Sequence, residues 1–247
     1  MALPSPLGLF SLPLLVLFHL TVPLGVDPPP SGPTGPGEGS STDLREQLEA
    51  RIGQEGDSIA ISVAYLDLGS GTRVEIAADR EFHAASTMKV PVLLEHLTPD
   101  SVQATMNRIG APGMKVLRGV SDIPAFEAGL SNRATARSYL RSLEVIAQCE
   151  ITSREACRDM MEILEGQEFT SELPAGIPAE ARAQGTRVGN KTGSITGILH
   201  DGAIVRPHHA DPYILIILTE GYDDHSVGSA AMAELSRLVW THHTASP

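Results

Sequence analysis

Ser86 and Lys89 are the first residues in this chain whose types and spacing could carry out chemistry. On a helix, residues i and i+3 share a face, so the Lys89 amine can reach the Ser86 hydroxyl. A serine at a helix N-terminus also lies where backbone N–H groups and the helix dipole stabilise negative charge. Such a serine could be acylated while Lys89 takes its proton, if burial or a second cation lowers the pKa of Lys89. The spacing alone is weak, because about one such pair is expected by chance.

A second motif, Lys191-Thr192-Gly193 in "RVGNKTGSITG", strengthens this interpretation. It predicts a strand segment that presents a cation, a hydroxyl and a bare backbone, which together suit a substrate carboxylate beside an edge strand. Gly193 permits a close approach of the substrate. Lys191 is also the second cation that could lower the pKa of Lys89. The two motifs in this order, with helices between them, favour an acylating serine hydrolase.

Other polar residues are weaker candidates. His208 and His209, near Asp211, could suggest a metal site, but a polar hairpin turn explains them better, and we expect neither a metal nor a cofactor. His200 and Asp201 could border a cleft at a strand edge, and we assign them no role.

The two cysteines, Cys149 and Cys157, are eight residues apart. On one continuous helix they would lie roughly 12 Å apart, too far to bridge. A turn at residues 150–152 could bring them together. We favour two separate buried or half-buried thiols.

Composition describes a globular chain outside the cytoplasm. The 247 residues are 42% hydrophobic and 19% charged, sufficient for one sizeable domain. The net charge of -12 argues against nucleic acid and anionic membrane surfaces as partners. Residues 1–26 are apolar, without Lys, Arg, Asp or Glu, and predict an export signal or a short membrane anchor. Residues 27–41 form a Pro/Gly/Ser linker, and residues 42–247 form the folded domain, periplasmic or extracellular.

The elements that must position these residues follow from periodicity. Residues 42–54 predict an amphipathic helix, and residues 58–68 and 73–78 predict a β-hairpin. The middle of the chain is helical. Its expected helices cover residues 100–110, capped by Thr98 and Pro99; residues 134–148; and residues 152–166, with Thr152 and Glu155 as a capping box.

The end of the chain returns to strands. These are expected at residues 187–194, 202–206 and 213–221, and a final helix at residues 224–243. Strands from both ends that enclose helices predict an α+β fold, an α/β sandwich. Its antiparallel sheet comes from the N- and C-terminal parts, is flanked by helices, and has a shortened helical region inserted.

With these motifs the chain resembles the class A β-lactamases and their serine-hydrolase relatives of the penicillin-recognising fold. The resemblance covers residues 44–240 and rests on "AASTMKVPVLLE", "PAFEAGLSNRATARSYLRSL" and "LPAGIPAEARAQGTRVGNKTGSITGILHDGAIV". It implies that Ser86 is the acylated nucleophile and Lys89 its proton partner. It also implies that Lys191 and Thr192 hold the β-lactam carboxylate, and that the backbone N–H groups of Ser86 and Ser194 form the oxyanion hole.

The resemblance further implies that Glu127, which opens "EAGLSN", activates the deacylating water. The match is imperfect, because class A enzymes follow Glu-x-x-Leu with asparagine, whereas this chain has Ser131 there and Asn132 one step later. Outside the family, a carboxylate on a solvated loop is ordinary, so Glu127 has a plain structural alternative.

One segment of the family pattern is missing. In the family, the helix after Ser-x-x-Lys continues into a long all-α segment with a Ser-Asp-Asn motif. Here "VPVLLEHL" joins "TPDSVQATMNRIG" almost directly, and the sequence contains no Ser-Asp-Asn. We therefore expect Leu93, Leu94 and Leu97 to be partly exposed.

Three functions remain open. The first is a β-lactamase-like hydrolase that acylates Ser86 and then releases the product with water. The second is a penicillin-binding, DD-peptidase- or esterase-like relative with poor turnover, and the third is a non-catalytic remnant. The expected partner is a small-molecule β-lactam or a peptidoglycan-like substrate, and the expected state is a monomer.

Overall fold

The computed structural model describes residues 36–95 and 98–245, so the predicted export signal or anchor at residues 1–26 lies outside it. No helix of the described residues is long and apolar enough to cross a membrane. Helix α1 (Pro36–Ile52) begins inside the predicted linker. Its buried side chains are Leu44 and Leu48, the four-residue rhythm that the sequence predicts.

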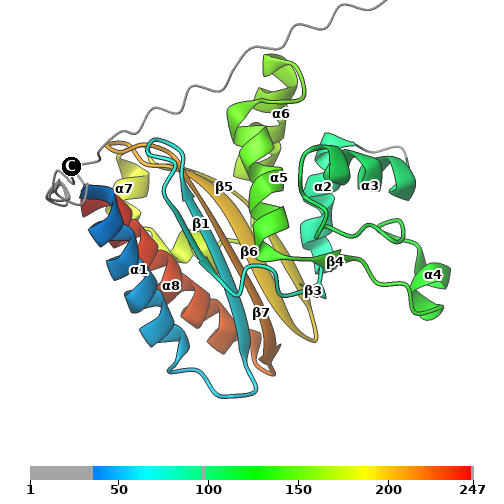
Figure 1. Cartoon of the computed structure of the whole chain (residues 1–247), viewed down its shortest axis with the longest axis horizontal. Helices are drawn as coiled ribbons and strands as arrows, with labels where there is room; N and C mark the ends of the chain where they lie inside the picture. Colours follow the sequence, from blue (N-terminus) through cyan, green and yellow to red (C-terminus); the bar gives the residue numbers. More distant parts are fainter. Residues whose placement is uncertain (1–35, 96–97, 246–247) are drawn as a thin grey trace, which may run out of the picture. The chain divides into compact units, whose positions relative to one another are not determined.

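The central element is a five-stranded antiparallel sheet, which confirms the predicted α+β fold (Figure 1). Its strand order is β2-β1-β7-β6-β5, so strands from the two ends of the chain pair in its middle. The strands are β1 (Ala60–Asp67), β2 (Arg73–Ile76), β5 (Arg187–Ile195), β6 (Gly197–Arg206) and β7 (Tyr213–Tyr222).

Helices cover both faces of this sheet (Figure 1). Helices α1 and α8 (His225–Ala245) pack on one face, and α5 (Ala136–Gln148) and α6 (Arg154–Glu165) on the other. Along β7, Leu215 and Ile217 belong to the core under α8, whereas Ile214 and Ile216 belong to the core under α5. This alternation is the two-residue period of a strand buried on both faces.

A shortened helical region lies beyond α5 (Figure 1). It consists of β3 (Phe82–His83), η1 (Ala85–Met88), α2 (Lys89–Leu94), α3 (Pro99–Arg108), α4 (Ile123–Glu127) and β4 (Arg133–Ala134). Thr98 caps α3 and Pro99 is its first residue, as predicted. Leu93 and Leu94 are half-buried against the larger core, and Leu97 lies outside the described residues.

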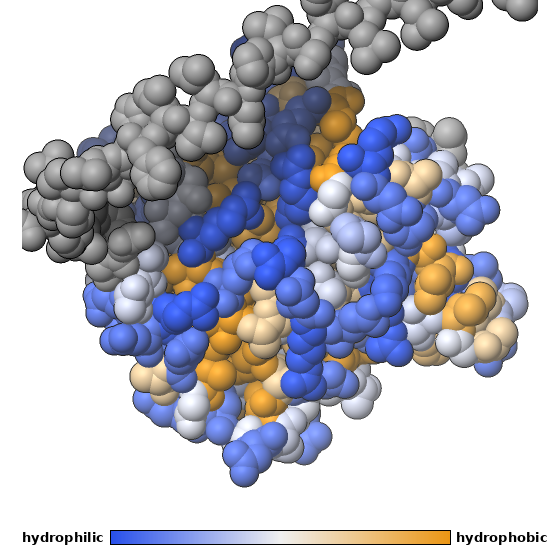
Figure 2. Space-filling model, in the orientation of Figure 1, coloured by the Kyte–Doolittle hydropathy of each residue, from blue (hydrophilic) through white to orange (hydrophobic). Residues whose placement is uncertain are grey.

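Apolar side chains are exposed around α4. Figure 2 shows them gathered at the right, over the region where Figure 1 places α4. The exposed large apolar residues of this segment are Leu117, Val120, Ile123, Phe126 and Leu130. The exposure expected beside the missing segment is therefore greatest around α4, rather than on α2.

Two short elements, η2 (Leu173–Gly176) and α7 (Ala179–Ala183), follow α6 in the chain and precede β5. Gly176 lies so close to α8 that a Cβ there would come within 2.4 Å of the Ala233 carbonyl oxygen. This contact packs η2 directly against α8, one of the helices that cover the sheet.

The structure corrects two predictions between α5 and α6. Cys149 and Cys157 form a disulfide, so the prediction of separate thiols is wrong. Cys149 ends α5 in the left-handed region with φ 57°, and the chain turns back because it is no longer helical there. The N-cap of α6 is Ser153, whose side chain accepts the Ala156 N–H, and not Thr152.

Candidate active site

The first pair of predicted residues lies in one turn. Ser86 belongs to the 3-10 turn η1, and Lys89 begins α2. The Lys89 Nζ lies 3.4 Å from the Ser86 Oγ, a distance from which the amine can exchange a proton with the hydroxyl after a small approach. Lys89 is exposed and Ser86 half-buried, so the pair is open to a ligand from solvent.

Strand β5 brings the second motif against this turn. A Cβ on Gly193 would lie 2.9 Å from the Thr87 backbone nitrogen and 3.0 Å from that of Ser86. Real Cβ atoms do not approach backbone so closely, so only glycine lets β5 touch η1 here. Ser194 follows on β5 and is exposed, whereas the Thr192 side chain is buried.

Lys191 and Lys89 form a pair of neighbouring cations. Lys191 is half-buried, and its Nζ donates a hydrogen bond of 2.8 Å to the Thr192 carbonyl oxygen. Burial lowers the pKa of Lys191, the Lys89 charge lowers it further, and Asp201 opposes both. Two cations with so few counter-charges favour an anionic ligand group between or beside them.

Buried groups hold β5 from behind. The Tyr139 hydroxyl of α5 donates to the Lys191 carbonyl oxygen at 2.8 Å, and the Asn190 Nδ2 donates to both Asp201 carboxylate oxygens at 3.1 Å. Burial raises the pKa of Asp201 to about 8, although the donors from Asn190 and Leu173 act to lower it. These contacts hold the backbone of β5 in place at Lys191 and at the neighbouring Asn190.

The suggestion that His200 and Asp201 border a cleft is wrong, because both are fully buried in β6. Tyr139 was missed because a tyrosine within the apolar stripe of a helix is ordinarily a core residue. His83, which accepts the Ala85 N–H at 3.0 Å, was missed as well. Its place three residues before Ser86 was the signal that could have found it.

Glu127 is the predicted residue that the structure does not tie to the others. It is exposed at the end of α4, and among the described residues no hydrogen bond or ion pair joins it to Ser86 or Lys89. The preceding residue, Phe126, packs edge-on against the His83 ring with centroids 6.5 Å apart. Helix α4 therefore contacts β3, the strand just before the turn that carries Ser86, through Phe126.

Asn132, the displaced asparagine of the same loop, has a different environment. Its Oδ1 accepts the N–H groups of Leu117 and Arg118 at 2.8 and 3.0 Å. Its Nδ2 lies 2.8 Å from the Met88 sulfur and donates to the Arg118 carbonyl oxygen at 3.1 Å. With these partners the amide serves to hold the loop, and is not free to orient a water for Glu127.

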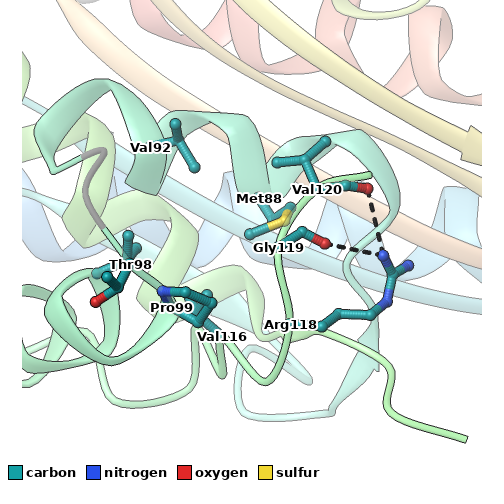
Figure 3. Close-up of a pocket in the computed structure, with 9 residues that line it drawn as sticks. Met88, Val92, Thr98, Pro99, Val116, Arg118, Gly119 and Val120 are labelled. Carbon is teal, nitrogen blue, oxygen red and sulfur yellow. Dashed lines mark hydrogen bonds between the residues drawn. The ribbon is translucent and has the colours of Figure 1, made fainter. Parts of the chain in front are cut away.

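A cavity of about 160 Å³ has Met88 among its lining residues (Figure 3). Val92, Pro99 and Val116 contribute apolar walls, and Arg118 donates to the Gly119 and Val120 carbonyls at its rim. None of Ser86, Lys89 and Lys191 lines it, so the cavity is separate from the predicted chemistry.

The pair His208 and His209, the weak candidate for a metal site, lies in the connection after β6. Their ring centroids are 4.2 Å apart, and the His208 N–H donates to Thr186 Oγ1. No group of three metal-binding side chains occurs within the described residues.

An antiparallel sheet between two helical layers, with a serine–lysine turn against its edge strand, is the fold of β-lactamase-like serine hydrolases. The model of the β-lactamase enzyme family matches residues 43–99 and 93–243. The chain belongs to this family. The two matched segments meet at residues 93–99, where the sequence places the missing segment.

Solved structures show the same fold. PBP-A, in an acyl-enzyme complex of a mutant with penicillin G, is 17% identical with a TM-score of 0.69, over 81% of this chain and 96% of that one. A β-lactamase from Sphaerobacter thermophilus is 19% identical with a TM-score of 0.68, over 85% and 98%. The class A β-lactamase of the last common ancestor of Gram-negative bacteria is 19% identical with a TM-score of 0.67, over 80% and 98%. The search of curated proteins gave no match.

Proposed function

We propose that this protein opens β-lactam rings by forming an acyl-enzyme at Ser86, and then hydrolyses the ester. The observation that carries the proposal is the contact of the two motifs. The Lys89 Nζ lies 3.4 Å from the Ser86 Oγ, and β5 touches the same turn at Gly193. Nucleophile, proton acceptor and anion-binding edge thus meet in one place.

The chemistry follows from these positions. Lys89 accepts the Ser86 proton as Oγ attacks the lactam carbonyl carbon. The backbone N–H groups of Ser86 and Ser194 receive the negative charge of the carbonyl oxygen. The C–N bond then breaks, and the nitrogen takes up a proton that Lys89 returns. Lys191 and Thr192 bind the substrate carboxylate meanwhile.

Hydrolysis of the acyl-enzyme requires a base near the ester, and Glu127 is the residue that the family resemblance assigns to it. Its exposure and the occupied amide of Asn132 favour slow deacylation. This supports a second candidate function, a penicillin-binding relative that acylates readily and turns over poorly. The two candidates share the acylation step and differ only in the fate of the ester.

We place this activity outside the cytoplasm. The apolar residues 1–26 support export, and the Cys149–Cys157 disulfide suits an oxidising compartment. We take the substrate to be a small-molecule β-lactam or a peptidoglycan-like compound, which can reach the exposed Lys89 from solvent, and the protein to be a monomer.

The test is covalent labelling of the purified chain with a penicillin, read by intact-mass spectrometry. We expect one adduct on the wild type and on the control Ser121→Ala, whose exposed side chain lies outside the site. Ser86→Ala should give none. A folded wild type without an adduct would exclude the proposed enzymatic function and favour a non-catalytic remnant. The adduct is then followed over minutes to hours. Its release indicates the hydrolase, and its persistence indicates the penicillin-binding relative.

A further inference from the structure

We propose that His83 is a positioning residue for Ser86: its imidazole accepts the Ala85 N–H and so holds the backbone turn that aims the Ser86 hydroxyl. The inference rests on the proposed function, because its readout is acylation of Ser86. His83 touches neither the serine nor any expected substrate group, and acts only through the intervening backbone.

The turn before Ser86 needs such support. Ala85 has φ 46°, a conformation that costs a non-glycine residue on the order of 1 kcal/mol and persists only where neighbours impose it. The His83 Nδ1 lies 3.0 Å from the Ala85 nitrogen, two residues ahead. This side-chain acceptor closes the same local ring that Asx side chains close in turns.

The backbone of His83 is itself held by the sheet. His200 of β6 is buried, and its Nε2 lies 2.9 Å from the His83 carbonyl oxygen. Its Nδ1 lies 3.1 Å from the Thr219 nitrogen, and the Thr219 hydroxyl donates to the nearby Leu199 carbonyl. A neutral His200 with its proton on Nε2 donates to the His83 carbonyl oxygen and accepts the Thr219 N–H, while its Nδ1 also lies 2.8 Å from the Leu199 carbonyl oxygen.

This arrangement links the two halves of the site. His200 pairs with Gly193 in the β5–β6 ladder, and Gly193 abuts the Ser86 backbone. The path from β6 through His83 and Ala85 thus meets the path through β5 at Ser86. The buried His200 thus contacts both parts of the site: it pairs with Gly193 of β5, and it hydrogen-bonds the backbone of His83 just before the turn that carries Ser86.

The surroundings of His83 favour the form that the hydrogen bond needs. An acceptor Nδ1 requires a neutral ring with its proton on Nε2, and Nε2 has no partner within the described residues. Burial lowers the pKa of His83, and the charges of Arg133 on β4 and Arg118 before α4 lower it further. The ring also lies edge-on to Phe126 of α4, and the titratable side chain of β6 that interacts with it electrostatically is His200.

Two substitutions separate the acceptor from the rest of the side chain. In His83→Asn, the amide Oδ1 takes the place of Nδ1 as acceptor and does not titrate. In His83→Leu, the acceptor is lost. At pH 7.5 we expect His83→Leu to acylate about 10- to 100-fold more slowly with penicillin, because a small displacement of a nucleophile has an effect of that order. His83→Asn should stay within about threefold of wild type.

The pH profile gives a readout that a purely structural role would not move. The pKa of His83 lies below its ordinary value of 6.5, and protonation turns Nδ1 into a donor that repels the Ala85 N–H. The ratio of wild-type to His83→Asn acylation rates should therefore fall as the pH drops below 6.5. The two proteins differ only at position 83, so pH effects from the rest of the site cancel in the ratio.

The outcomes are distinct. A ratio that stays constant down to the lowest pH at which both proteins remain folded, or a folded His83→Leu that acylates as fast as wild type, would overturn the role of His83 and leave the proposed function intact. A folded wild type that never labels would overturn the proposed function itself. If His83→Leu does not fold, the ratio of the other two proteins still decides.

Discussion

Gly193 of β5 lies against Ser86 so closely that a methyl group on Gly193 would stand 3.0 Å from the Ser86 backbone nitrogen. The same methyl group would stand 2.9 Å from the Thr87 backbone nitrogen. Both neighbours are backbone atoms of one tight turn, so neither can rotate away. The distance between nucleophile and substrate strand is thus set by the absence of a side chain.

Gly193→Ala should therefore force β5 and η1 apart. We expect a loss of about 1–3 kcal/mol in unfolding free energy, as for other overpacked sites, and acylation slowed about 10- to 100-fold. Denaturant unfolding and penicillin labelling measure the two effects. Gly56→Ala is the control, because the nearest atom there is 4.0 Å away. Normal acylation by Gly193→Ala would mean that the close contact is not required.

Lys191→Ala should slow acylation by a carboxylate-bearing penicillin about 10- to 100-fold, the value of a charge-assisted hydrogen bond of 1.5–3 kcal/mol. Its unfolding free energy should change little, because Lys191 is only half-buried. The methyl ester of the same penicillin lacks the anion, so wild type and variant should acylate with it at similar rates. Lys115→Ala removes an exposed lysine elsewhere and should be normal. An equal loss with acid and ester would contradict the recognition role.

Glu127→Gln should preserve the burst of acylation and lower the steady hydrolysis of a chromogenic cephalosporin at least tenfold, because the base for the water is lost. Glu162→Gln, which replaces an exposed carboxylate of α6, is the matched control. Stopped-flow absorbance separates burst from steady rate. Unchanged steady turnover would make Glu127 an ordinary loop carboxylate and favour the slow penicillin-binding function.

The unfolding free energy should depend on pH through two buried groups of β6. Burial raises the pKa of Asp201 from 3.8 to about 8, so its contribution falls as the pH rises from 4 to 8. Burial lowers the pKa of His200 from 6.5 to about 4, so its contribution rises with pH from 4 to 6.5. The two oppose each other below pH 6.5, and only Asp201 acts above it.

We therefore expect a loss of about 2 kcal/mol between pH 6.5 and 8, at about 1.4 kcal/mol for each pH unit of one proton. Urea unfolding at the two pH values measures it. Asp201→Asn, which cannot titrate, should remove this loss of unfolding free energy between pH 6.5 and 8. An equal loss in wild type and Asp201→Asn would assign the pH dependence to other groups.

The disulfide should stabilise the α5–α6 corner. Closing a loop with a separation of eight residues removes conformational entropy of the unfolded chain worth about 2.5 kcal/mol. A reducing agent should lower the unfolding free energy by that amount. The double variant Cys149→Ser, Cys157→Ser should be less stable from the start and insensitive to the reducing agent. Equal stability of the oxidised and reduced wild type would show that the turn forms without the disulfide and that the bond adds no stability.

The sequence by itself determined the local elements and the types of residue that could act. Ser86 and Lys89 share a face because of helical spacing, and Lys191 lies on a strand because its neighbours have strand character. Thr98 and Pro99 identify the start of α3 because capping depends on adjacent residues alone. The junction after α2 was also visible, since it is a feature of chain order.

Only the tertiary structure decided which of these residues meet and how deeply they are buried. Gly193 reaches Ser86 because β5 and η1 pack across the edge of a sheet whose strands come from both ends of the chain. Cys149 bonds Cys157 because one residue leaves the helix into the left-handed region. Asp201 and His83 acquire shifted pKa values from desolvation and from charges far away in sequence. Such contacts depend on long-range packing, which the local periodicity of a sequence does not encode.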